Sequence, residues 1–182
     1  MKKFFFLVLI VFTNAAIAQD RKDSSDGRFH DDLLDNLQGT WKVNSIAHGF
    51  PSTGTIKGAW VLNHQFFYLH FMGTDTIPWW HMPMEYVEYF GYNSRAKRYT
   101  IHGMSIEGDA DPSDGFSYGY RDGNTLKTVA KAGGDTLMIQ RLTWEPASRT
   151  WSIKSTASID GKERSEIFLE MKLEGLNAPS EK

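Results

Sequence analysis

Two apolar stretches of this chain carry, at alternate positions, side chains suited to holding a small molecule. Residues 66–72 (Phe-Phe-Tyr-Leu-His-Phe-Met) place Tyr68 and His70 on one face of an extended strand. Residues 84–91 place Tyr86 and Glu88 on one face in the same way. If both faces point into a closed interior, they give aromatic walls with a few polar groups, as in most small-molecule pockets. The alternative is an interior filled by its own side chains.

Further ligand contacts are expected from neighbouring segments. Trp60 adds an aromatic wall and His102 a polar anchor from a later strand. Arg141 or Arg121 would pair with a ligand carboxylate if one of their side chains turned inward. The predicted ligand-binding residues are therefore Trp60, Tyr68, His70, Trp79, Trp80, Tyr86, Glu88, His102 and Arg141.

The paired tryptophans Trp79 and Trp80 stand in a proline-containing link, residues 73–83, between two predicted strands. Indole rings in such a link favour a lid over the mouth of a pocket or an exposed contact patch. The same rings would serve as local core if the link folded back on itself. The alternative interpretation is that the protein is an interaction module with a filled interior, which acts through this loop.

Patterns for catalysis and metal binding are weak. The sequence has no Gly-x-Ser-x-Gly elbow, phosphate-binding glycine loop or His-Glu-x-x-His motif. Carboxylates alternate in residues 107–115 as in a calcium loop, but proline interrupts them and no glutamate closes the loop. An enzyme would need carboxylates or histidines that converge with shifted pKa values. We predict no catalytic residue, no metal and no cofactor, and keep an enzyme as the least favoured alternative.

The first residues have the three parts of a secretory signal. Lys2 and Lys3 precede an apolar run too short to span a bilayer, and Ala16-Ile17-Ala18 gives a small-x-small cleavage site. We expect cleavage after Ala18 and a periplasmic or secreted protein with no integral membrane segment in the mature chain. Because the signal contains two of the 20 basic residues, 18 remain against 22 acidic ones. This balance gives no electrostatic reason to bind nucleic acid.

The mature chain is expected to form a single domain. We divide the sequence into a signal peptide (1–18), a disordered polar leader (19–29), a folded domain (30–175) and a flexible tail (176–182). The chain has no cysteine, so packing rather than disulfides must hold the fold. Neither the oligomeric state nor the identity of a ligand follows from these features.

From Gly39 onward, apolar or alternating runs are separated by short turn signals such as Asp122-Gly123 and Asp160-Gly161. About ten strands joined by hairpin-length links predict an antiparallel meander. Closure removes its exposed edges, so we expect an all-β up-and-down barrel with a short helical turn over residues 30–37.

The lengths of the links predict a difference between the two ends of this barrel. Alternate links of a meander meet at the same end, so the three longest, residues 49–54, 73–83 and 107–115, share one mouth. Long loops at one mouth and tight turns at the other are typical of a ligand cup. We therefore expect a small apolar or amphipathic ligand in the lumen.

The segment Leu37-Gln38-Gly39-Thr40-Trp41-Lys42-Val43 resembles the Gly-x-Trp signature that opens the first strand of lipocalins and fatty-acid-binding proteins, the calycin superfamily. Gly91-Tyr92-Asn93, followed by Lys97 and Tyr99, and the run from Ile167 to Leu173 are similar to a group of uncharacterised exported bacterial lipocalin-like domains. The resemblance implies a barrel whose first-strand tryptophan plugs the closed end. Trp41 is therefore expected to be structural.

Overall fold

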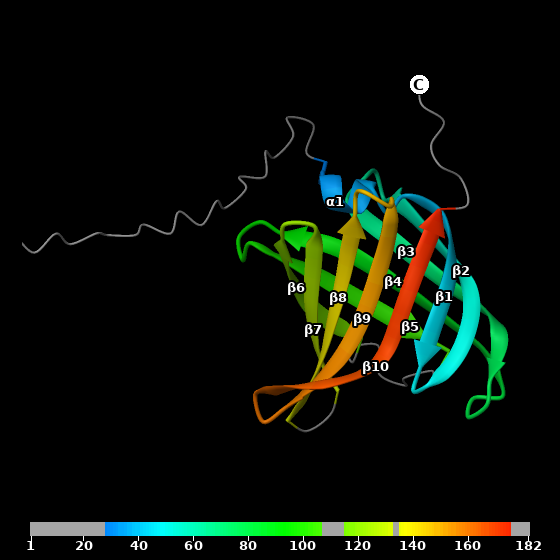
Figure 1. Cartoon of the computed structure of the whole chain (residues 1–182). Helices are drawn as coiled ribbons and strands as arrows, with labels where there is room; N and C mark the ends of the chain where they lie inside the picture. The colour runs from blue at the N-terminus through cyan, green and yellow to red at the C-terminus, as the bar shows by residue number, and fades with distance from the viewer. Residues whose placement is uncertain (1–27, 107–114, 133–134, 176–182) are drawn as a thin grey trace, which may run out of the picture.

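A computed structural model describes residues 28–106, 115–132 and 135–175. In this part of the chain ten antiparallel strands form a closed barrel, in which each strand pairs with its sequence neighbours and β1 pairs with β10 (Figure 1). The strands are β1 (Gly39–Ala47), β2 (Phe50–Val61), β3 (Phe66–Ile77), β4 (Met82–Asn93), β5 (Arg98–Ser105), β6 (Phe116–Asp122), β7 (Thr125–Lys131), β8 (Thr136–Glu145), β9 (Thr150–Ile159) and β10 (Lys162–Gly175). A short helix, α1 (Asp32–Asp35), precedes them. The expected all-β barrel with a helical turn is confirmed.

Several expectations fall on residues outside the described ranges. These are the signal peptide (1–18), nearly all of the leader (19–29), the tail (176–182) and most of the acidic loop 107–115. Among the residues that are described, no helix has the length and apolarity needed to cross a membrane.

The expected loop lengths are wrong for two of the three links. β2 begins at Phe50 and β3 continues to Ile77, so most of residues 49–54 and 73–83 belong to strands. Polar side chains extend these strands beyond the apolar runs: the backbone N–H and hydroxyl of Thr53 donate to Asp75 Oδ2 at 2.6 and 2.7 Å. Sequence periodicity does not detect pairing of this kind.

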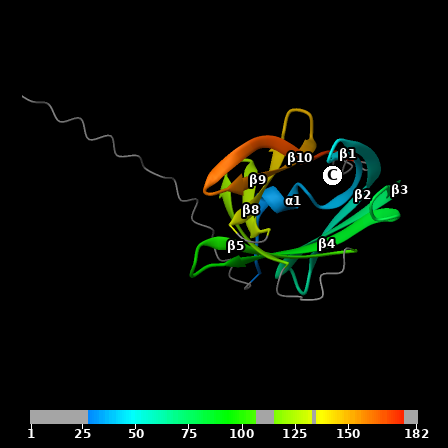
Figure 2. The same ribbon diagram turned by 90° about the horizontal axis from the view of Figure 1, so that it is seen from below.

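Helix α1 closes the barrel at the end where β1 begins. Seen along the barrel, it lies within the ring of strands (Figure 2), and Leu33, Leu34 and Leu37 belong to the buried core. Asp31 caps the helix, because its Oδ1 accepts the backbone N–H groups of Leu33 and Leu34 at 2.9 and 3.2 Å. A Cβ on Gly58 would lie 2.3 Å from the Leu37 carbonyl oxygen, so this close approach of backbones requires glycine.

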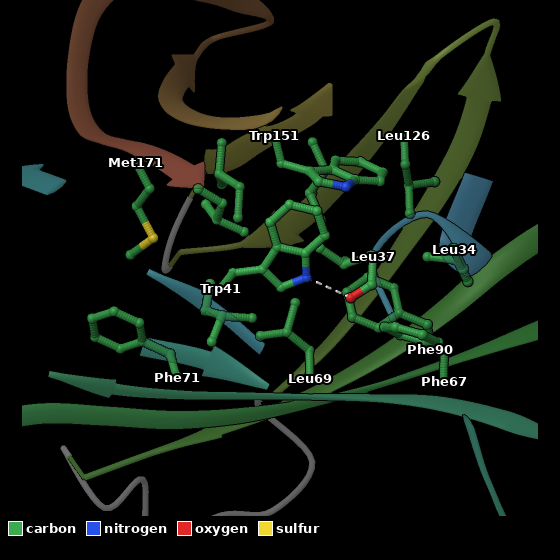
Figure 3. Close-up of a cluster of buried hydrophobic side chains, with 14 of the residues drawn as sticks. Leu34, Leu37, Trp41, Phe67, Leu69, Phe71, Phe90, Leu126, Trp151 and Met171 are labelled. Atoms are coloured by element: carbon green, nitrogen blue, oxygen red, sulfur yellow. Dashed lines mark hydrogen bonds between the residues drawn. The ribbon is translucent and has the colours of Figure 1, made fainter. Parts of the chain in front are cut away.

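Three indoles from the barrel wall hold α1 in place. Trp41 Nε1 donates to the Leu37 carbonyl at 2.9 Å (Figure 3), and Trp151 Nε1 donates to the Asn36 carbonyl at 3.2 Å. Trp60 Nε1 donates to Asp35 Oδ1 at 2.7 Å. The first two bonds pair backbone carbonyls of the segment that follows α1, which would otherwise be penalised by burial. The predicted structural role of Trp41 is confirmed.

The beginning of α1 is held by a buried polar network. The Tyr99 hydroxyl donates to Asp31 Oδ2, and Arg121 contacts Asp31 Oδ1 at 3.3 Å. Arg121 also donates to both carboxylate oxygens of Asp32, at 2.5 and 3.0 Å. These bonds raise the pKa of Arg121 above its ordinary value, the hydrogen bond to Asp32 contributing most. Arg121, which points into the lumen at this end, is therefore paired with the two acidic residues at the start of α1.

Candidate functional site: the barrel lumen

The register of the strands decides which predicted residues face the lumen. Phe67, Leu69 and Phe71 of β3 are buried and pair with Phe90, Glu88 and Tyr86 of β4. Tyr86 and Glu88 therefore point inward, while Tyr68 and His70 alternate with the buried residues and point outward. The hypothesis that the His70 and Glu88 faces share the lumen is wrong. Both faces of residues 66–72 are rich in apolar side chains, so periodicity did not distinguish them.

The outer surface of β3–β6 carries an aromatic row, formed by Tyr68, Tyr89, His102 and Phe116. These residues pair successively across the four strands. His102 stacks on Phe116, with ring centroids 4.2 Å apart, and Tyr68 contacts Tyr89 at 5.1 Å. His70 lies on the same face, where its Nε2 contacts Glu85 Oε1 at 2.6 Å. The predicted anchors Tyr68, His70 and His102 thus belong to this outer face.

Trp60 and Arg141 also lie away from an open lumen. Trp60 stacks on His64 at the α1 end, with ring centroids 4.1 Å apart, and its indole is bonded to Asp35. Arg141 alternates with the buried Leu142 and so points outward, where it binds both carboxylate oxygens of Glu163 at 2.6 and 2.8 Å. Both predicted ligand contacts are therefore occupied by interactions within the protein.

Trp79 and Trp80 lie in the turn between β3 and β4, at the end opposite α1. The Trp79 ring contacts His48 and Phe50 of the adjacent β1–β2 hairpin, at centroid distances of 6.0 and 6.1 Å. The Trp79 side chain is nevertheless 45% exposed. This position at the rim suits both a lid and a contact patch, and the choice between them stays a prediction.

The lumen has two halves that differ in accessibility. The closed half surrounds α1, and its inward-facing side chains are buried; they include Leu34, Leu37, Trp41, Leu126 and Trp151 (Figure 3). The accessible half lies toward the opposite end, where Phe71, Ser155 and Met171 are buried but other inward-facing residues remain partly accessible; these include Met84, Tyr86, Glu88, Gly103, Ser105 and Gln140. The barrel interior is thus packed around α1 and reached by solvent beyond it.

Glu88 is the inward-facing carboxylate of the accessible half. Its side chain lies over Gly103, where a Cβ would be 3.6 Å from Glu88 Cγ. Burial raises the pKa of Glu88 from its ordinary 4.5 to about 7, and no hydrogen bond or ion pair from a described residue offsets that cost. The inward-facing Glu88 side chain is thus largely withdrawn from water and still partly accessible.

Tyr86 reaches across the lumen from the same face. Its hydroxyl contacts the sulfur of Met171 on β10 at 3.8 Å, and its ring stacks on Phe71 at 5.2 Å. Burial raises the pKa of Tyr86 well above its ordinary value, and the nearby charge of Glu88 adds to this effect. Tyr86 and Met171 therefore join opposite walls beside Glu88.

Ser155 is a second polar group of the inner wall. It pairs with Leu169, the inward neighbour of Met171 on β10, and is completely buried. Its hydroxyl has no hydrogen-bond partner among the described residues. Sequence reasoning missed Ser155, Gly103 and Met171. The one available signal was the alternation Trp151, Ile153, Ser155, which places a hydroxyl on an otherwise apolar face.

No three histidine or acidic side chains of the described ranges come close enough to hold a metal ion. No model of a known protein family matches the chain, and no curated protein sequence is similar to it.

Proposed function

We propose that this protein binds a small apolar or amphipathic molecule in the accessible half of its lumen. The observation that carries the proposal is Glu88, a desolvated carboxyl that faces an accessible interior without a protein partner. Burying such a group lowers stability. Costs of this kind are concentrated at functional sites, where a ligand supplies the missing interaction.

The walls beside Glu88 support this proposal. Met84 and Tyr86 are partly accessible and offer apolar and polarisable surface, and Tyr86 contacts the buried Met171 behind them in the core. Largely apolar walls with a few polar groups are the usual composition of small-molecule sites. The contacts assigned to the ligand are therefore Tyr86 and Glu88 from the sequence, together with Met84.

Export and ancestry belong to the same proposal. The signal-like pattern of residues 1–18 supports a periplasmic or secreted location, and Gly39-Thr40-Trp41 in a closed barrel supports a lipocalin-like relationship. Trp79 and Trp80 lie at the end where the lumen is accessible, which supports their role as a lid. An enzyme is less well supported, because no second titratable group of the described residues hydrogen-bonds Glu88.

The proposal is tested by native mass spectrometry of the protein purified from its own producing cells, followed by organic extraction. We expect a stoichiometric small-molecule adduct that is lost in Gly103→Leu, which fills the space beside Glu88. Met104→Leu, the adjacent position on the outer face of β5, is the matched control and should keep the adduct. A ligand-free mass for the unmodified protein, or an adduct retained in Gly103→Leu, would contradict the proposal.

The exposed Trp79 ring favours one alternative, an interaction module that acts through the rim. In that case Trp79→Ala would abolish association with a partner protein, and Gly103→Leu would not affect it. Cross-linking in extracts of the producing cells separates the two functions.

A further inference from the structure

Acidic and basic side chains are distributed differently along the inward-facing surface of the barrel. From β1 to β9, and over Leu169–Leu173 of β10, the inward positions of the described strands carry Glu88, Asp75 near the end of β3, and one basic side chain, Arg121. Asp75 is hydrogen-bonded by Thr53, whereas Glu88 has no such partner among the described residues. Arg121 lies at the closed end, where Asp31 and Asp32 occupy it. The accessible half therefore offers a ligand a carboxylate and no cation.

Basic side chains of β8 and β9 lie outside the barrel, where they form ion pairs with acidic residues. These pairs are Arg141 with Glu163 at 2.6 Å and Lys154 with Glu170 at 2.9 Å. Positive charge is thus held at the outer surface of these strands while Glu88 is left without a partner inside.

The surroundings of Glu88 discriminate between ligand head groups. An ammonium group beside this carboxyl would form a charge-assisted hydrogen bond, which is stronger when both groups are withdrawn from water. A carboxylate ligand would bring a second negative charge into the same low-dielectric space, and its repulsion by Glu88 would add to its own desolvation. Met84, Tyr86 and Met171 provide apolar contact for an alkyl or aromatic tail in either case.

We infer that the lumen selects amphipathic amines, molecules with an apolar body and a protonated amino head group held by Glu88, and disfavours fatty-acid anions. This inference rests on the proposed lumen site and names the class of its ligand. The resemblance to fatty-acid-binding barrels would suggest the opposite choice. The difference follows from the absence of a free inward-facing cation over the described strands.

The test compares octylamine, octanol and octanoate, which share a tail and differ in the head group. Dissociation constants are measured at pH 8 from methyl NMR shifts of the methionines, with Met84 and Met171 reporting on the lumen and Met72 and Met104 on the outer face. We expect octylamine to bind about tenfold more tightly than octanoate, the difference that one charged hydrogen bond supplies. Octanol should lie between them.

Two variants, one on each face of β4, show whether the preference depends on the charge of Glu88. Glu88→Gln keeps the shape and should bring the amine and the carboxylate to within about threefold of each other, as expected once the charged bond is lost. Glu85→Gln removes an equal charge from the outer face of the same strand and should preserve the tenfold preference.

The possible outcomes test the preference for amines separately from binding in the lumen. Octanoate binding as tightly as octylamine, or a preference that survives in Glu88→Gln, would overturn the amine assignment while lumen binding stood. If none of the three compounds moved the Met84 and Met171 signals, both the amine assignment and the proposed lumen site would be wrong.

Discussion

The closed and accessible halves of the lumen satisfy their polar groups differently, although the same strands build both. Around α1, Asp31 accepts hydrogen bonds from Tyr99 and Arg121, and the indoles of Trp41 and Trp151 donate to the carbonyls of Leu37 and Asn36, just after the helix. Toward the other end, the partly accessible Glu88 and the buried Ser155 have no such partners among the described residues. The comparison teaches that hydrogen-bonded polar groups stabilise the fold. Polar groups without a partner mark the place where a bound ligand would supply the missing hydrogen bonds. Four comparisons, each between two variants, test this contrast in order of expected effect.

Asp31→Ala should produce the largest loss of stability. It removes the helix cap and the buried carboxylate that Tyr99 and Arg121 contact, and breaking a buried charged pair costs about 3–5 kcal/mol. Urea denaturation measures the free energy of unfolding. Asp32→Ala, at the exposed partner of Arg121, should cost about 1 kcal/mol or less. Equal losses in the two variants would mean that the buried network does not hold α1.

Leucine truncations along one face of β10 compare the halves directly. Leu173 is completely buried, so Leu173→Ala should lower the free energy of unfolding by about 2–4 kcal/mol. Leu169 is partly accessible, and Leu169→Ala should cost about 1 kcal/mol because less apolar area returns to water. Thermal or urea unfolding gives both values. A larger loss at Leu169 would show that the accessible half is as tightly packed as the closed half.

Glycine-to-alanine substitutions probe the space in each half. Gly58→Ala places a methyl group against the Leu37 carbonyl and should cost about 1–3 kcal/mol, the usual penalty for overpacking. Gly103→Ala places the same group 3.6 Å from Glu88 Cγ, an ordinary contact, and should change stability by less than about 0.5 kcal/mol. Calorimetric unfolding distinguishes the two. Similar losses of stability at both positions would show that the two halves of the lumen are packed equally tightly.

The pH dependence of stability isolates Glu88. Its pKa is about 7 in the folded state and near 4.5 when unfolded, so the folded state binds the proton more tightly. Stability contributed by this group is complete below about pH 4.5, falls as the pH rises to about 7 and is then constant. Relative to the unmodified protein, Glu88→Gln should therefore gain about 1–2 kcal/mol between pH 4 and pH 8, allowing for partial solvation.

This gain is read from urea denaturation at each pH. Glu85→Gln, at the outward-facing neighbour, serves as the control for a general effect of charge. A pH profile for Glu88→Gln that parallels the unmodified protein would show that Glu88 is already solvated or paired.

The fold was predictable because its signals are local. Turn pairs such as Asp160-Gly161 and the Gly-Thr-Trp opening of β1 establish a meander, and closure follows from the cost of free edges. The site was only half predictable. Tyr86 and Glu88 point inward, but Tyr68 and His70 do not, because a strand with apolar residues on both faces does not reveal its register.

Other features of the site depend on contacts distant in sequence. Trp60 binds Asp35, and Arg141 binds Glu163, pairings that strand alternation does not indicate. Gly103 creates space only because Glu88 crosses over it from the next strand. Such features depend on how the strands are aligned with one another, and the sequence of a single strand does not reveal that alignment.

The most direct test of the central claim is a crystal structure of the protein soaked with 8-bromooctan-1-ol, a neutral ligand whose bromine is located by anomalous scattering. The account predicts bromine density inside the barrel, among Met84, Tyr86 and Met171. Density confined to the outer aromatic row or to the exposed Trp79 ring, with none in the lumen, would contradict it.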